Sequence, residues 1–136
     1  MSSLTINAIR ALAASVFLTG AVTSCFPATD EAKCSEEVVG SVAAVGGAKT
    51  GTVGTPVPVS YIVSIPNGCG KFQGLREQRD GKKIYLVPTV RYEGCSCPQV
   101  VSDYQGTYQF TAAEPGTYVL LFPNITQTLT DTITIQ

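Results

Sequence analysis

Short runs of alternating apolar and polar residues occupy most of the chain after residue 37. The clearest run covers residues 57–65, and its apolar side chains are Val57, Val59, Tyr61, Val63 and Ile65. An alternation with a period of two places successive side chains on opposite faces of a β-strand. The sequence therefore predicts a half-buried strand here, ended by a turn at Pro66, Asn67 and Gly68.

The same pattern predicts seven strands in all, over residues 38–45, 57–65, 71–79, 84–92, 108–112, 118–122 and 129–135. Phe72 and Leu75 lie three residues apart, so both point inward only if a bulge at Gly74 shifts the strand. Asp80-Gly81 predicts a hairpin turn. Pro88 lacks a backbone donor and therefore predicts an edge strand. Residues 46–55 and 94–105 are predicted loops.

The segment from Phe110 to Phe122 (FTAAEPGTYVLLF) resembles the turn between strands E and F of immunoglobulin-like domains. The resemblance implies that Tyr118 is a tyrosine-corner residue, whose hydroxyl bonds back across the turn. Together with the strand pattern it leads us to expect an all-β fold, a seven-stranded antiparallel immunoglobulin-like sandwich over residues 38–136. The disulfide between strands B and F of antibody domains is missing, and we interpret the inward aromatic residues as core.

Residues 11–22 (ALAASVFLTGAV) form an uncharged apolar run. The run is shorter than the roughly 20 residues that span a bilayer as a helix, and it is typical of a secretory signal peptide. Val22-Thr23-Ser24-Cys25 follows and resembles the lipobox of bacterial lipoproteins. The resemblance implies a signal peptide over residues 1–24 and a lipid-modified Cys25 as the first mature residue. The alternative is an ordinary secreted protein, cut near Ala28.

The lipoprotein resemblance also implies a place in the cell envelope. Phe26, rather than Asp, follows Cys25, and in that family this favours the outer membrane. Residues 25–37 are small, polar and acidic, and we interpret them as a tether. Nine residue steps separate Cys25 from Cys34, so the tether reaches at most about 30 Å. We expect the lipid bilayer to be a partner through acylated Cys25, with the domain close to it.

Four further cysteines remain: Cys34, Cys69, Cys95 and Cys97. An even number in an exported domain predicts two disulfides, and the strand order places all four cysteines at one end of the sandwich. A bond between Cys95 and Cys97 would close a very small ring. We therefore expect Cys34 and Cys69 each to pair with one of these two cysteines, and of the two pairings that remain we favour Cys69–Cys95 and Cys34–Cys97. A thiol-redox or zinc-binding site at this end is the alternative.

Composition narrows the function classes. The net charge is −1 and there is no basic face, so we expect no nucleic-acid partner. The sequence has no His or Trp, and its one Met is Met1. Catalysis by Ser-His-Asp or Cys-His groups is therefore excluded, as is metal binding by His. We expect a protein that is not an enzyme and has no cofactor or metal.

The leading hypothesis is a non-catalytic binding or structural module. Its protein or glycan partner would meet the loops opposite the cysteines, over residues 46–55, 79–83 and 113–116. The one basic cluster of the sequence lies there and consists of Arg76, Arg79, Lys82 and Lys83. These side chains either are solvated charges on a hairpin or contact the partner. The alternative is a protease inhibitor, because residues 65–70 (IPNGCG) resemble the first inhibitory loop of chagasin-type inhibitors. The Arg-Pro-Trp loop of those inhibitors is missing.

Overall fold

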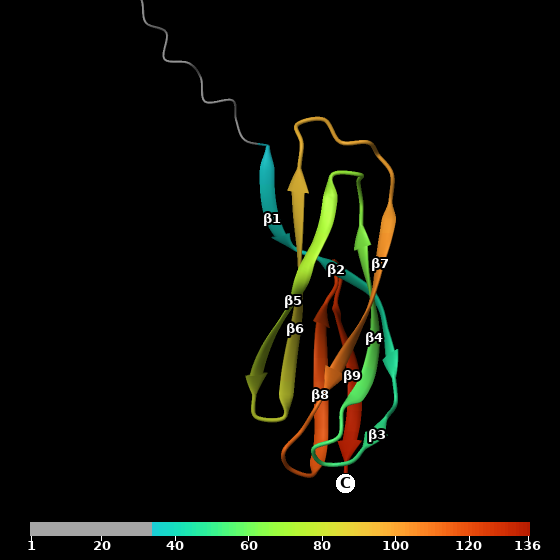
Figure 1. Ribbon diagram of the computed structural model, residues 1–136, viewed down its shortest axis with the longest axis vertical. Helices are drawn as coiled ribbons and strands as arrows, with labels where there is room; N and C mark the ends of the chain where they lie inside the picture. Colours follow the sequence, from blue (N-terminus) through green and yellow to red (C-terminus); the bar gives the residue numbers. More distant parts are fainter. Residues whose placement is uncertain (1–33) are drawn as a thin grey trace, which may run out of the picture.

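A computed structural model describes residues 34–136, and these form nine strands in two sheets (Figure 1). The predicted signal peptide, Cys25 and residues 26–33 of the predicted tether lie outside the described residues. The last three tether residues, 35–37, are not tether, because they belong to the first strand. The strands are β1 (Ser35–Val39), β2 (Ser41–Gly47), β3 (Thr50–Gly51), β4 (Val57–Ile65), β5 (Gly70–Asp80), β6 (Lys83–Glu93), β7 (Ser102–Phe110), β8 (Gly116–Pro123) and β9 (Thr128–Ile135). Within residues 34–136 there is no helix of the length and hydropathy that a membrane crossing requires.

Two sheets pack face to face as a β-sandwich. The smaller sheet has the order β2-β4-β7 and is antiparallel throughout. The larger sheet has the order β1-β6-β8-β9-β3, with β5 on the other side of β6. This sheet is mixed, because β6 pairs with β8 in parallel and β3 pairs with β9 in parallel. The prediction of seven purely antiparallel strands was therefore wrong, although the all-β sandwich is confirmed.

The inward-facing side chains of both sheets meet in one apolar core. Every second residue of β4 is buried from Val57 to Ile65, as the alternation predicted. Full burial of one large aliphatic or aromatic side chain stabilises a fold by about 1.5–3 kcal/mol. The other strands contribute the buried side chains of Val42, Ile84, Leu86, Val90, Phe110, Tyr118, Leu120, Phe122, Ile133 and Ile135.

The first apolar run proves to be two strands in different sheets. β1 pairs with β6 in the larger sheet, and β2 pairs with β4 in the smaller one. The chain crosses between them at buried Gly40, whose N–H donates to the carbonyl of Pro88 (2.8 Å). A Cβ at Gly40 would lie 2.9 Å from Val90 and 3.0 Å from Val63, so the crossing passes too close to both sheets for a side chain. β1 also begins at Ser35, before the predicted strand.

Pro88 does not mark an edge strand, contrary to the prediction. β6 has β5 along one side, and on the other side β1 and β8 pair with its two halves. The carbonyl of Pro88 points toward the β1 side, where it accepts from Gly40. In an antiparallel strand the N–H and C=O of one residue point to the same side. The missing donor therefore falls in the gap between the pairings of β1 and β8, where it breaks no ladder bond.

Three local predictions are confirmed. The register of β5 against β6 shifts between Phe72 and Gly74, which is the expected bulge. Asp80 pairs with Lys83 in a tight hairpin, where Gly81 has a φ of 59°. The hydroxyl of Tyr118 donates to the carbonyl of Glu114 (2.9 Å), as a tyrosine corner requires.

The strand predicted from residue 108 instead begins at Ser102, so part of the predicted loop 94–105 belongs to β7.

Candidate functional site

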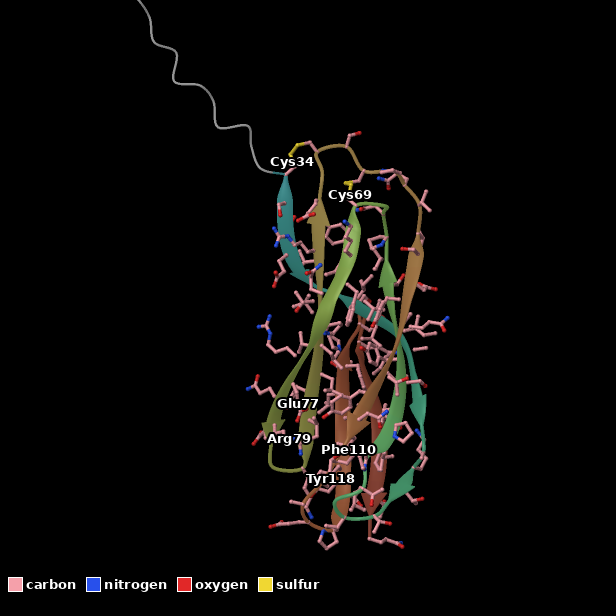
Figure 2. The ribbon with its side chains drawn as sticks, in the orientation of Figure 1. Cys34, Cys69, Glu77, Arg79, Phe110 and Tyr118 are labelled. Atoms are coloured by element: carbon pink, nitrogen blue, oxygen red, sulfur yellow. A yellow bond between two sulfur atoms is a disulfide. The ribbon has the colours of Figure 1, made fainter. Side chains whose placement is uncertain are left out.

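The predicted gathering of four cysteines at one end of the sandwich is confirmed. We call this end the cysteine pole; Figure 2 shows Cys34 and Cys69 there, with both sulfur–sulfur bonds. The disulfides join Cys34 to Cys95 and Cys69 to Cys97, with Cα–Cα separations of 5.0 and 5.3 Å. The favoured pairing of Cys69 with Cys95 and Cys34 with Cys97 was therefore wrong.

The arrangement of strands around β6 explains the observed pairing. β1 lies on one side of β6, and the N–H of Gly94 donates to the carbonyl of Cys34 (2.7 Å). This places Cys34 beside Cys95, which directly follows Gly94. β5 lies on the other side of β6, and its start is preceded by Cys69. Between Cys95 and Cys97 the chain passes over the end of β6, and this places Cys97 beside Cys69.

Both disulfides close long loops. Their sequence separations are 61 and 28 residues. In the chain-entropy account, loops of this size correspond to about 3–4.5 kcal/mol of stabilisation each. All four sulfur atoms are used in these bonds, and among residues 34–136 no group of three or more His, Cys, Asp or Glu side chains is placed to hold a metal ion.

A hollow of about 470 Å³ lies beside the disulfides. Its polar side chains are those of Ser35, Glu36, Asn67 and Tyr92. Burial, and then the negative charge of Glu36, raise the pKa of Tyr92. The tyrosine hydroxyl therefore stays protonated at neutral pH and is available as a hydrogen-bond donor.

A second hollow, of about 550 Å³, lies on the β2-β4-β7 sheet. Uncharged residues line it, and they include the small residues Ala44, Ser60 and Gly106 together with the two tyrosines Tyr61 and Tyr104. The hollow has no ionisable side chain other than tyrosine. Its floor is tightly fitted, because a Cβ on Gly106 would lie 2.5 Å from the hydroxyl oxygen of Tyr61. A molecule bound here would be held by hydrogen bonds and by close fit, and not by a charged side chain.

The predicted far-pole loops do come together at the end opposite the cysteines, where Figure 1 shows the β5–β6 hairpin, the β7–β8 turn and the C-terminus. We call this end the far pole. The N–H of Gly54 donates to the carbonyl of Ala112 (2.9 Å), and that of Val53 donates to Gln136 (3.0 Å). These bonds join residues 46–55 to the β7–β8 turn and to the end of the chain. The prediction that residues 46–55 are a loop was wrong in part, because they contain the end of β2 and the two-residue strand β3.

Two of the four clustered basic residues make structural contacts. The guanidinium of Arg79 lies 5.7 Å from the ring centre of Phe110, and its Nη1 donates to the carbonyl of Thr111 (3.2 Å). The Nζ of Lys82 donates to the carbonyl of Pro115 (3.2 Å) and lies 5.8 Å from the ring centre of Tyr118. Both cations therefore tie the β5–β6 hairpin to the start and end of the β7–β8 turn.

Glu77, Arg79 and Tyr108 form a polar cluster that joins β5 to β7 (Figure 2 labels Glu77 and Arg79). The hydroxyl of Tyr108 donates to Oε2 of Glu77 (2.6 Å), while Arg79 pairs with Oε1. Burial pushes the pKa of Glu77 upward, but the bonds from Tyr108 and Arg79 more than offset this and hold the pKa below its usual value. Burial and the bond to Glu77 raise the pKa of Tyr108.

The ion pair between Lys49 and Asp131 could not be predicted from the sequence pattern. Asp131 faces the core from β9 and is 3% exposed, and its Oδ1 pairs with Nζ of Lys49. Its Oδ2 has no hydrogen-bond partner. The alternation of β9 places Asp131 on the inward face, yet nothing in the pattern identifies Lys49, which is 82 residues away, as its partner.

Two packed sheets, one shared core and two disulfides at one end define a β-sandwich domain. The sequence model of the family described as "ORF11 beta-sandwich domain" matches residues 59–135, and the chain belongs to this family. The match runs from β4 to the end of β9, so β1, β2, β3 and Cys34 precede it. No curated protein and no solved structure matches the chain.

Proposed function

We propose that this protein is an exported lipoprotein, held at a membrane by acylated Cys25, whose β-sandwich is a non-catalytic binding or structural module. One observation carries the proposal. Of the five cysteines, four form two disulfides within the domain, and the fifth is Cys25. Cys25 follows the apolar run and the small residues that a lipobox requires, so it has a separate role from the other four.

The disulfides support export, because such bonds persist in oxidising compartments such as the bacterial periplasm and the cell surface. They also favour a structural role for Cys95 and Cys97 over the thiol-redox and zinc alternatives. Lipid chains on Cys25 would bury many CH₂ groups at about 0.8 kcal/mol each, which holds the domain at the bilayer firmly. By the lipoprotein sorting rule the proposed membrane is the outer membrane.

The non-catalytic role is supported by how two of the acidic side chains are used. Asp131 is buried in its pair with Lys49, and both carboxylate oxygens of Glu77 are bonded, one to Arg79 and one to Tyr108. The proposed partner is a protein or glycan that meets the far pole, since the tether joins the opposite end. The tyrosine corner at Tyr118 supports an immunoglobulin-like assignment, with the mixed sheet as a departure.

Fractionation of cells tests the anchor. The natural protein is expected in the outer-membrane fraction, and labelled fatty acid is expected in its band. Cys25→Ser is expected to abolish the label and to release the domain from the membrane. Ser24→Ala is the matched control, because alanine is also small and leaves the motif intact. Label that persists in the Cys25→Ser variant would contradict the proposal.

A further inference from the structure

The segment over residues 94–101 (GCSCPQVV), which we call the pole loop, crosses the cysteine pole and has no charged side chain. The turn of Pro66, Asn67 and Gly68 lies against it and is also uncharged; the N–H of Gly68 donates to the carbonyl of Pro98 (2.8 Å). Ionisable groups oppose contact with a bilayer because they must be desolvated. The pole loop and its neighbouring turn present none.

Val100 and Val101 in the pole loop are 60% and 68% exposed. Other large hydrophobic residues are exposed within residues 34–136, but none of them adjoins another along the chain: they are Val39, Val53, Tyr85, Tyr104 and Ile125. Single exposed apolar residues are normal on protein surfaces and need no explanation. Val100 and Val101 are the one pair of exposed large hydrophobic residues within residues 34–136 that are neighbours along the chain.

The pole loop is joined to the rest of the domain near its middle, at Cys97 and at Pro98. The Cys69–Cys97 disulfide holds its middle, and the N–H of Val100 donates to the carbonyl of Pro98 (2.9 Å). An ordered segment that already presents its apolar side chains loses little conformational entropy on binding. The pole loop is therefore suited to contact a surface without rearranging.

The proposed tether brings a membrane to this end of the domain. It reaches the domain at Cys34, which a disulfide joins to Cys95 in the pole loop itself. Only nine residue steps separate Cys34 from Cys25, so Cys34 lies within about 30 Å of the anchored lipid, and the Cα of Cys95 in the pole loop lies 5.0 Å from that of Cys34. Figure 2 shows Cys34 at the same end as the second disulfide.

We infer that the pole loop contacts the bilayer surface, with Val100 and Val101 inserted among the lipid headgroups beside the acyl chains of Cys25. This inference rests on the proposed function, because the tether supplies the membrane. The exposed acidic residues of β1 and of the end of β6 are Glu36, Glu37 and Glu93. Glu93 pairs with Arg91 (2.9 Å), and the exposed Asp103 follows Val101 by two residues. The charge of Glu36 and Glu37 favours a tilt that turns β1 toward water and the uncharged pole loop toward lipid.

The contact depends on the anchor. Two valine side chains bury too little apolar surface to recruit a domain from solution. Once the lipid is inserted, the tether makes the contact intramolecular, and a weak interaction is then sufficient to orient the domain. The result is a domain whose far pole points away from the membrane and is available to partners.

Tryptophan fluorescence in reconstituted vesicles tests the inference directly, because the natural chain contains no Trp. Val101→Trp and Val100→Trp place the sole tryptophan in the pole loop. Val53→Trp is the matched control, since Val53 is an exposed valine (38%) at the far pole. In vesicles with brominated acyl chains the two pole-loop variants are expected to lose about half of their emission and to shift to the blue, whereas Val53→Trp is expected to stay unchanged.

Two controls separate the outcomes. Thiol titration without reductant confirms that each variant folded with both disulfides, and flotation of the vesicles shows whether the protein is anchored. Anchored, folded protein with equal emission from all three variants would overturn the membrane contact and leave the proposed function intact. Protein that lacks lipid and does not float would overturn both proposals.

Discussion

At the cysteine pole, β1, β5 and the pole loop are joined by two disulfides, whereas at the far pole the β5–β6 hairpin and the β7–β8 turn are joined by hydrogen bonds and by cations over aromatic rings. β1 has five residues and pairs only with β6. Its backbone hydrogen bonds alone therefore contribute little to keeping β1 attached to the sheet. Ladder length alone does not explain the difference, because the shortest ladder, that of β3 with β9, lies at the far pole, where no disulfide occurs among residues 34–136. The disulfides lie instead just before the first residues of β1 and β5, where both strands enter the larger sheet.

The largest expected effect comes from the disulfides. Replacing Cys69 and Cys97 together by Ala is expected to lower the free energy of unfolding by about 3–4 kcal/mol. Denaturant unfolding under oxidising conditions measures this loss. Replacing Cys34 and Cys95 by Ala is the comparison. A somewhat larger loss, of about 4–4.5 kcal/mol, is expected because this disulfide closes the longer loop, and amide exchange should increase first in β1. A loss below about 1 kcal/mol for both pairs would show that the cysteine pole does not depend on them.

The next effect concerns the buried ion pair. Lys49→Met leaves Asp131 buried without its partner and is expected to destabilise the fold by about 2 kcal/mol, less than for a fully buried pair because Lys49 is largely exposed. Combining it with Asp131→Leu should restore most of the loss, since the uncompensated charge is removed. Lys83→Met, at an exposed lysine, is the control in thermal unfolding. No difference between Lys49→Met and Lys83→Met would refute the role of the pair.

The Glu77 cluster predicts a pH dependence. The pKa of Glu77 is lower in the folded protein than in the unfolded chain, so the carboxylate stabilises the fold above its ordinary pKa of about 4.3. That contribution is lost as the pH falls through the lowered pKa. Glu77→Gln is expected to lower the free energy of unfolding by about 1 kcal/mol at pH 7. Below pH 4 the natural protein loses about the same amount, so the free energies of unfolding of the two proteins should converge. Glu37→Gln, at an exposed position, should show no such convergence in melting curves.

The smallest effect is expected at the tyrosine corner. Tyr118→Phe removes the hydroxyl that donates to Glu114 while keeping the ring in the core, so a loss of about 0.5–1 kcal/mol is expected. Tyr85→Phe is the matched control, because the Tyr85 side chain is more than a third exposed. Equal melting temperatures for the two variants would mean that the corner bond adds nothing.

Features set by local pattern were predictable from the sequence. The strand from Val57 to Ile65 follows from alternation, the hairpin from Asp80-Gly81, and the bulge in β5 from the spacing of Phe72 and Leu75. These depend on neighbours within a few residues. The sequence also predicted that the cysteines share one end, because an antiparallel strand order alone fixes which turns lie together.

Features that depend on which strand lies beside another were not predictable. The apolar run around Gly40 is continuous in pattern, so nothing in it shows that the chain changes sheets there. That change puts β1 beside β6, and this in turn decides that Cys34 meets Cys95. The pairs of Asp131 with Lys49 and of Glu77 with Tyr108 depend likewise on packing between distant segments.

The most direct test of the central claim is the intact mass of the protein extracted from membranes, alkylated before and after reduction. The account predicts a chain that begins at Cys25 and carries acyl groups, with no alkylation before reduction and four alkylated cysteines after it. Fragmentation should then link Cys34 to Cys95 and Cys69 to Cys97. A mature chain without lipid, or one with thiols that react before reduction, would contradict the account.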